Sequence, residues 1–175
     1  MAKANLLITH DPSHADHAVK EVRRIFKDHK IRGTVAKGKS LGVLLARVSK
    51  PKEVVQKLAK ACAKNPAEFA NTFHYIPIEK WVKANVKSMQ KAIKPLVKNI
   101  KVNESWKLDL RKRNLEIDSV QLIKDLTEVV DRKVVDLERP KKTIQVQVVG
   151  KEAGISVLSS NEIFNAADYK ILNAK

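Results

Sequence analysis

The sequence is poor in several residue types, and each shortage excludes a class of protein. Cys62 is the only cysteine in 175 residues, so no internal disulfide can form, and a disulfide-stapled fold is excluded. Aromatic residues make up only 5% of the chain, which leaves Val, Ile, Leu and Ala to fill the core. No apolar run approaches the roughly 18 residues of a membrane span, and no secretory leader opens the sequence. We therefore expect a cytoplasmic protein with no membrane association.

Acidic residues are also scarce relative to basic ones. The chain has 35 Lys and Arg against 19 Asp and Glu, which gives a net charge of +16 and a pI of about 10.0. Both halves share the excess, with +9 over residues 1–78 and +7 over residues 79–175. This charge favours a partner that carries phosphates over an acidic small-molecule substrate.

The first 77 residues contain the pattern of a small α+β domain. The expected elements, in order, are a strand at 6–9, a helix capped by Asp11 or Ser13, strands at 33–37 and 41–48 joined by a tight turn, a helix from Pro51 to about Asn65, and a strand at 73–77. This β-α-β-β-α-β order predicts a ferredoxin-like domain over residues 1–77. Cys62 is in phase with the apolar residues of the second helix, so we expect it to be a small buried hydrophobe.

A long amphipathic helix is predicted to open the second half. Its apolar positions recur at spacings of four and three: Val82, Val86, Met89, Ile93, Leu96 and Ile100. Pro95 is expected to kink or split this helix near Lys94, because proline lacks the amide proton and crowds the preceding turn. The further expected elements are a strand at 105–111, a helix capped by Asp118 or Ser119, a short strand at 133–137 and a hairpin of strands 143–149 and 155–158. The last 17 residues are expected to be a loosely packed tail of a second domain, 78–175.

The opposite side of the same predicted helix carries positive charge alone. Seven lysines follow the helical period with no acid between the first and the last: Lys80, Lys83, Lys87, Lys91, Lys94, Lys98 and Lys101. A solvated helix usually mixes Glu with Lys, because pairs at i,i+4 stabilise it and like charges there repel. A polyanionic partner would explain this arrangement, and the structural alternative is a Lys-rich face that serves only solubility.

Two patterns suggest other chemistry, and neither is supported by its context. Gly33 to Ser40 matches the phosphate-loop pattern G-x-x-x-x-G-K-S, but that loop needs a strand before it and a helix after it, whereas a helix precedes and a strand follows here. His10, His14 and His17 lie near Asp11 and Asp16, but polar residues are expected at a helix start, and no distant ligand completes a zinc site. We predict no metal, no cofactor, no catalytic constellation and no enzyme activity of the chain alone.

From Ile76 to Leu158 the sequence resembles a THUMP domain, an RNA-binding module of tRNA-modifying proteins. The segments that carry the likeness are 76–80 (IPIEK), 106–114 (WKLDLRKRN), 134–140 (VVDLERP), 144–148 (IQVQV) and 154–158 (GISVL). A ferredoxin-like unit before the module is usual in that family. One departure is that Arg139 and Lys141 stand where an Asn and an Asp are common.

The resemblance implies that the module helps to place tRNA, while a separate domain or protein performs the modification. The chain is most similar to single-THUMP proteins that act as adaptors for cytidine acetylation, so the implied partners are tRNA and a separate tRNA acetyltransferase. The alternatives are a general RNA-binding module for another tRNA-modifying enzyme and, in a different class, a stand-alone enzyme or a DNA-binding protein.

The predicted RNA-binding residues come from the two lines of reasoning together. The resemblance supplies Lys80 and the strand end from Arg111 to Asn114, and the arginines there suit bidentate phosphate contacts. The complete set is Lys80, Lys83, Lys87, Lys91, Lys94, Lys98, Lys107, Arg111, Lys112, Arg113, Asn114, Lys37 and Lys39.

Overall fold

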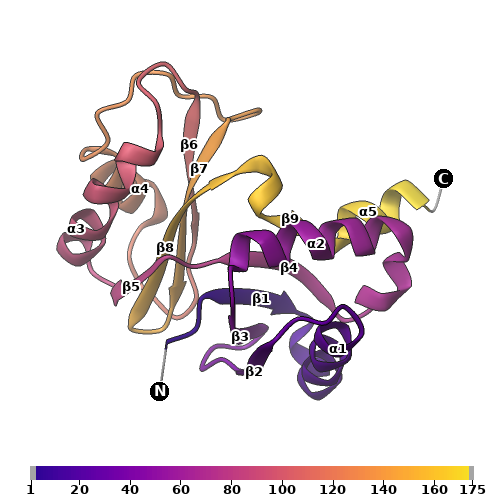
Figure 1. Cartoon of the computed structure of the whole chain (residues 1–175). Helices are drawn as coiled ribbons and strands as arrows, with labels where there is room; N and C mark the ends of the chain where they lie inside the picture. The colour runs from indigo at the N-terminus through magenta and orange to yellow at the C-terminus, as the bar shows by residue number, and fades with distance from the viewer. Residues whose placement is uncertain (1–2, 174–175) are drawn as a thin grey trace. The chain divides into compact units, whose positions relative to one another are not determined.

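The computed structural model describes residues 3–173 and divides into two compact units (Figure 1). Unit 1 contains the chain up to Pro77 together with the segment from Asn161 onward, and unit 2 is Ile78–Ser160. The α+β class predicted from sequence is confirmed. The expected boundary after residue 77 coincides with the observed one, but the C-terminal segment belongs to the first unit and not to the second.

Unit 1 is built on an antiparallel sheet. Its elements are β1 (Leu6–His10), α1 (Ala15–Asp28), β2 (Gly33–Lys37), β3 (Val43–Val48), α2 (Pro51–Lys64), β4 (Thr72–Pro77), β9 (Phe164–Asn165) and α5 (Ala166–Asn173), with short 3-10 turns at Pro12–His14 and Pro66–Phe69. The strand order is β2-β3-β1-β4-β9. The predicted β-α-β-β-α-β order is confirmed, although β3 begins at Val43 and not at Leu41.

Helices α1 and α2 cover one face of this sheet because each has a continuous apolar stripe. Asp11 accepts a hydrogen bond from the Ser13 amide, but it caps the 3-10 turn Pro12–His14 that leads into α1; His14, at the start of α1 itself, makes no side-chain cap bond. Both stripes merge with the inward side chains of the strands into one hydrophobic core. Cys62 is fully buried in that core, and desolvation raises the pKa of its thiol to about 11, which confirms its role as a small hydrophobe.

A buried carboxylate, which the apolar pattern did not reveal, joins α1 to the start of β4. One oxygen of Glu21 accepts bonds from the backbone and side-chain amides of Asn71, at 2.9 and 3.0 Å, and the other accepts from the amide and hydroxyl of Thr72, at 3.1 and 2.8 Å. The Thr72 hydroxyl also lies 2.8 Å from the Tyr75 hydroxyl. Because every lone pair that faces the protein is used, the charge can be buried at modest cost.

The C-terminal segment is packed in unit 1, so the expectation of a loose tail is wrong for the part of it that the structure describes. Strand β9 pairs with β4, and the Phe164 ring stacks on Tyr75 with centroids 4.9 Å apart and an interplanar angle of 4°. Phe69 meets both rings edge-on. Ala174 and Lys175, which the prediction also covered, lie outside the described residues.

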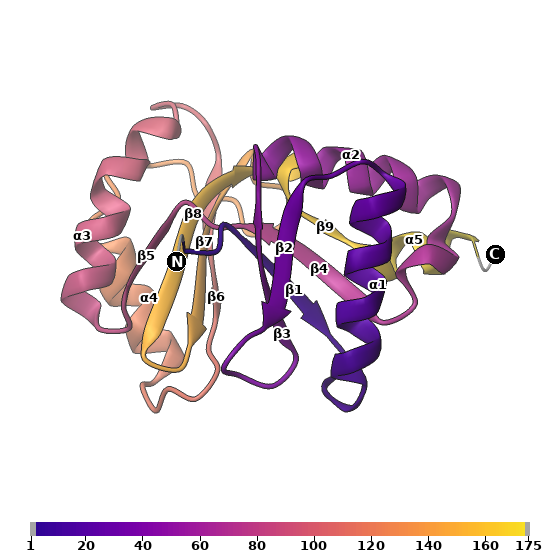
Figure 2. The same cartoon turned by 60° about the horizontal axis from the view of Figure 1, so that its bottom comes forward.

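Unit 2 has a mixed sheet with two helices on one face. Its elements are β5 (Lys80–Lys83), α3 (Val86–Leu96), a 3-10 turn (Val97–Asn99), β6 (Trp106–Arg111), α4 (Ser119–Thr127), β7 (Lys142–Val149) and β8 (Glu152–Ser159). The strand order is β5-β8-β7-β6, with β6 and β7 parallel and the other neighbours antiparallel. Figures 1 and 2 show α3 and α4 next to each other on the same side of this sheet. Their apolar sides and the inward residues of the strands form a second core.

Three predictions in unit 2 are wrong in detail. The helix does not begin near Lys80, because residues 80–83 form β5, and Asn85 caps the helix by accepting from the Ser88 amide at 2.8 Å. Pro95 does not split the helix; it lies in the last turn, and the chain tightens into a 3-10 turn after Leu96. The strand expected at 133–137 is reduced to one parallel bridge between Val135 and Trp106.

We predict that Phe164→Ala destabilises unit 1 by about 3–5 kcal/mol, because it removes the ring that stacks on Tyr75 and leaves a cavity. Both tryptophans, Trp81 and Trp106, lie in unit 2, so urea unfolding followed by far-UV circular dichroism should shift while the tryptophan fluorescence transition does not. Leu172→Ala is the control in the same segment: that side chain is 71% exposed, and the change should cost less than about 0.5 kcal/mol. An unshifted dichroism transition for Phe164→Ala would contradict the packing described here.

Candidate nucleic-acid interface

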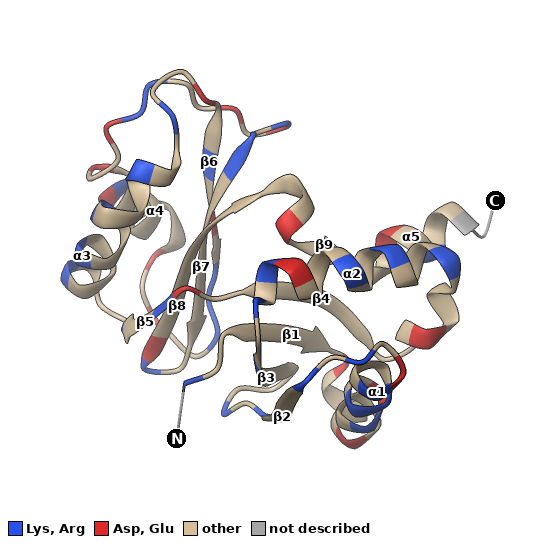
Figure 3. Cartoon of the chain, viewed as in Figure 1, with Lys and Arg blue, Asp and Glu red and all other residues tan. Residues whose placement is uncertain are grey.

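The outer side of α3 carries a row of exposed lysines. We call Lys87, Lys91, Lys94 and Lys98 the α3 lysine ridge; the last of them lies in the 3-10 turn that follows the helix. Their spacings of four, three and four place them on one side, while Met89 and Ile93 are fully buried on the other. Figure 3 shows this basic colouring along α3. Among the described residues, none of the four ridge lysines forms an ion pair, so the ridge presents uncompensated charge.

Lys80 and Lys83 are not part of the ridge. Both lie on the edge strand β5, opposite Ile155 and Glu152 of β8. Side chains alternate along a strand, and Val82 packs against the helical core, so Lys80 lies on the face that bears α3 and Lys83 on the other face. The predicted helical phase is therefore wrong for these two residues, although both are exposed.

Lys107 and Arg111 lie on the face of the sheet opposite α3. Trp106, Leu108 and Leu110 pack against the helical core, and alternation along β6 turns the intervening residues away from it. The Arg111 Nε lies 3.8 Å from the Asp109 carboxylate, which offsets part of its charge. The predicted RNA-binding residues of unit 2 thus form two separate basic surfaces.

Arg113 is the best-oriented cation of the second surface. Its backbone extends the pairing beyond β6: its amide donates to Val148 at 3.1 Å, and its carbonyl accepts from Gly150 at 3.1 Å. Its guanidinium Nη1 donates to the Gln147 Oε1 at 3.0 Å. Desolvation, and next the charge of Arg111, lower the pKa of Arg113, yet a guanidinium stays charged at neutral pH. Among the described residues it has no carboxylate partner.

A chain of side-chain amides supports that guanidinium. The Gln147 Nε2 donates to the Gln145 Oε1 at 2.9 Å, and the Gln145 Nε2 donates to the Asp109 Oδ2 at 3.3 Å. Because the Gln147 Nε2 is hydrogen-bonded to Gln145, the side-chain amide has a fixed orientation, and its Oε1 points toward Arg113. The remaining donors of Arg113 are therefore held in a defined direction.

The two other predicted residues of this turn have structural roles. The ammonium of Lys112 donates a hydrogen bond to the Ile117 carbonyl, and this bond stabilises the loop that follows β6. Asn114 has a positive φ of 57°, in the left-handed region that Asn tolerates better than most residues, and makes the turn itself.

Lys37 and Lys39 belong to unit 1. Lys37 ends β2 and pairs with Asp16 at 2.7 Å, and Lys39 is exposed in the connection from β2 to β3. Since strands flank this connection on both sides, the phosphate-loop pattern has no helix N-terminus to bind a nucleotide. The histidines at the start of α1 make local contacts: His14 lies 3.3 Å from Asp11, and no three His, Cys, Asp or Glu side chains converge on a metal position within residues 3–173.

Sequence reasoning missed two cations that the fold brings to one place. Lys20 and Arg23 lie one turn apart on α1 and line a groove beside β2. Their spacing of three residues was visible in the sequence, but no pattern indicated which strand α1 would pack beside.

The comparison with known families identifies the second unit. Residues 83–158 match the THUMP domain. The chain therefore contains a THUMP domain. This confirms the resemblance to a THUMP domain, and the match begins at the last residue of β5 and ends within β8. No curated protein matches the sequence.

Solved structures show that the fold of nearly the whole chain recurs in larger proteins. PH1313 from Pyrococcus horikoshii is 12% identical, with a TM-score of 0.67 over 92% of this chain and 55% of that one. TrmN from Thermus thermophilus is 16% identical, with a TM-score of 0.58 over 92% of this chain and 46% of that one. A 4-thiouridine synthetase, solved with RNA and ATP, is 11% identical, with a TM-score of 0.54 over 93% of this chain and 42% of that one. The chain spans about half the length of these proteins, and identities this low show the fold alone.

No helix within residues 3–173 is both long enough and apolar enough to cross a membrane.

We predict that Lys91→Glu stabilises unit 2 by about 0.5–1 kcal/mol in low salt, because it replaces like-charge repulsion with attractive pairs to Lys87 and Lys94. Urea unfolding followed by tryptophan fluorescence measures this. The gain should shrink in about 0.5 M salt, where exposed charges are screened. A loss of stability would mean that the ridge contributes to the fold, contrary to its exposure.

Proposed function

We propose that this chain is a tRNA-binding THUMP protein that acts as an adaptor, presenting tRNA to a separate acetyltransferase for cytidine acetylation. The observation that carries the proposal is the α3 lysine ridge on a THUMP domain, exposed and without ion pairs to any residue from 3 to 173. Lysines of one sign in a row repel one another and lower the stability of the helix. A bound polyanion would neutralise these lysines, and the release of counterions from its phosphates would favour binding.

The chemistry of the two basic surfaces supports RNA backbone recognition. Lysines act as flexible point charges, so the ridge suits attraction to many phosphates without fixed geometry. Arg113 is oriented by Gln147 and has free donors in a fixed plane, which suits a bidentate contact with one phosphate. Helical RNA hides its base edges in a deep and narrow groove, so these contacts would read shape and backbone.

The catalytic step is assigned to a partner in this proposal. The sequence resembles single-THUMP adaptors of acetylation, and the described residues supply cations for binding rather than a nucleophile held by a base. Cys62 is buried and its pKa is raised to about 11, which makes it unsuitable as a nucleophile.

A second candidate function is an RNA-binding module for a different tRNA-modifying enzyme. The observation that favours it is the fold similarity to TrmN and to a 4-thiouridine synthetase. The two candidates share the RNA-binding surface and differ in the partner, so an acetylation assay separates them.

We predict that tRNA binding weakens with salt, with a slope of log affinity against log salt of about −3 to −5. Reversing Lys87, Lys91 and Lys94 to Glu should weaken binding and reduce the slope by about 2–3, since each lost phosphate contact removes about 0.9. Fluorescence anisotropy of labelled tRNA measures both quantities.

The matched control for that triple variant reverses three scattered exposed lysines of unit 2, Lys124, Lys133 and Lys151. It changes net charge equally and should reduce the slope less. Equal losses with both triple variants would show that net charge acts without a defined surface. Salt-insensitive binding by the native chain would overturn the proposal.

We predict that the full chain raises cytidine acetylation of tRNA when it is added to the matching acetyltransferase, acetyl donor and ATP, because holding the substrate makes the encounter effectively intramolecular. Arg111→Ala with Arg113→Ala should raise the KM for tRNA and change kcat less, since these residues contribute to capture and not to chemistry. The chain alone should modify nothing. If it binds tRNA but leaves acetylation unchanged, the adaptor function fails and the RNA-binding module stands.

A further inference from the structure

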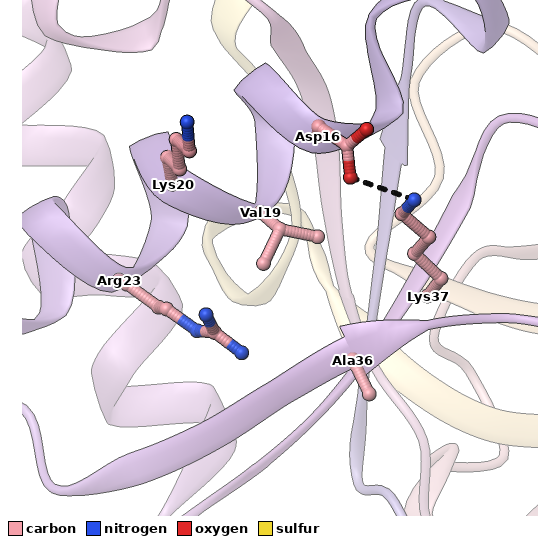
Figure 4. A pocket seen from close by; sticks show the side chains of 6 residues that line it. All are labelled: Asp16, Val19, Lys20, Arg23, Ala36 and Lys37. Carbon is pink, nitrogen blue, oxygen red and sulfur yellow. Dashed lines mark ion pairs between the residues drawn. The ribbon is translucent and has the colours of Figure 1, made fainter.

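Unit 1 contains a basic groove between α1 and the edge strand β2. The groove is open to solvent, has a volume of about 680 Å³ and is lined by Asp16, Val19, Lys20, Arg23, Ala36 and Lys37. Figure 4 shows Arg23 extending from α1 toward Ala36, Lys20 beside it on the same helix, and Lys37 reaching from β2 to Asp16 at the other end. Strand β2 is an outer strand of the sheet, so the groove opens along an edge.

The charge of the groove is positive and only partly compensated. Lys37 pairs with Asp16 at 2.7 Å, whereas Lys20 and Arg23 form no ion pair or side-chain hydrogen bond among the described residues. By contrast, Arg24, the next residue of α1, is engaged by donating to the Glu68 carbonyl at 2.7 Å. Of the two cations without such partners, Arg23 extends toward β2, and Lys20 lies one turn away on the same helix at the rim of the groove (Figure 4).

The shape of the groove suits a chain that carries regularly placed charges. Lys20 and Arg23 lie one helical turn apart, and Lys37 lies across from them at the end of β2. Val19 and Ala36 are the apolar side chains that line the groove between these cations (Figure 4). Protein interfaces are depleted of lysine at their buried centres, whereas two of the six lining residues here are lysines.

We propose that this groove binds the sugar-phosphate backbone of RNA, as a contact separate from the surfaces of the THUMP domain. The inference rests on the proposed function, which supplies the RNA, and adds Lys20 and Arg23 as binding residues. RNA fits better than an acidic peptide because the part of unit 1 that contains the groove has an excess of positive charge, with 15 basic and 6 acidic residues over residues 1–77. Arg23 would bind a phosphate through its planar guanidinium, and Lys20 would act as a neighbouring point charge.

Asp16 is the acidic residue of the groove, and its removal is expected to strengthen RNA binding, whereas removal of the cations weakens it. The hydrogen bond and the charge of Lys37 lower the pKa of Asp16, so this carboxylate is ionised at neutral pH and competes with a phosphate for Lys37. Removing that charge should free Lys37 and strengthen RNA binding. A residue with a merely structural role would not produce such a gain.

The experiment measures binding of labelled tRNA to the full chain by anisotropy at several salt concentrations. Lys20→Gln with Arg23→Gln should weaken binding about 5- to 30-fold, from two exposed charge contacts of roughly 0.5–1 kcal/mol each, and reduce the salt slope by about 1.4–1.8. Asp16→Asn should tighten binding about 2- to 5-fold. Circular dichroism verifies that each variant is folded.

Matched controls in unit 1 isolate the groove from net charge. Lys60→Gln with Lys64→Gln removes two exposed lysines of α2 that do not line the groove, and Asp28→Asn removes an exposed acid at the end of α1. Both controls should have smaller effects than their groove counterparts. Equal effects of control and groove variants would overturn the proposal.

The outcomes also separate this inference from the proposed function. If the α3 ridge variants lose tRNA while the groove variants bind normally, the groove proposal is wrong and the tRNA-binding function stands. If the groove variants bind tRNA normally but no longer raise acetylation, an acidic segment of the enzyme occupies the groove, which also overturns RNA as its ligand. If the native chain binds no tRNA, the proposed function itself fails.

Discussion

The exposed charge of unit 2 depends on the burial of one side of α3. Met89, Ile93 and Ile100 have no exposed surface, and burying side chains of this size contributes roughly 1.5–3 kcal/mol each. Repulsion between neighbouring lysines costs only tenths of a kcal/mol per pair. The core interaction therefore outweighs the repulsion, so α3 and the 3-10 turn after it hold the four ridge lysines outward, and within residues 3–173 no acidic residue pairs with them. A surface that would be unfavourable on an isolated helix is stable here because the sheet determines which side faces solvent.

Unit 1 depends on a different constraint, because its sequence is discontinuous. The Glu21 network fixes Thr72, Thr72 contacts the Tyr75 hydroxyl, and the Tyr75 ring receives Phe164 from the end of the chain. Residues more than 80 positions apart thus complete one core, with the THUMP domain inserted between them. A truncation after Ser160 would remove the Phe164 ring from Phe69 and Tyr75 and leave only their contact with each other. For this reason the two units should be compared by substitution in the full chain and not by cutting it.

The sequence predicted those elements whose pattern is local and long. Helices α1 and α2 and the strands of the first unit have clear apolar stripes and caps, so their positions agree within a few residues. β5 was missed because Lys80 and Lys83 are three positions apart, as on one side of a helix, and Lys80-Trp-Val-Lys83 lacks the apolar-polar alternation that would indicate a strand. β9 and α5 were missed because their packing depends on a few aromatic contacts to distant residues. Glu21 was invisible for a similar reason, since its partners are about 50 positions away.

The opposite placement of Lys107 and Arg111 relative to the ridge was already implicit in the sequence. The helix and β6 both turn their apolar residues toward one core, so the polar side of the strand must face away from the helix. The sequence could not show whether each cation is exposed without a partner, oriented by a neighbouring amide or paired with an acid. In the part of the chain that the structure describes, the ridge lysines form no ion pair, Arg113 is held by the Gln147 amide, and Lys37 is paired with Asp16. Mobile charges attract a polyanion over a distance and a braced guanidinium holds one phosphate locally, so the lysines and Arg113 should contribute to capture of the RNA in different ways.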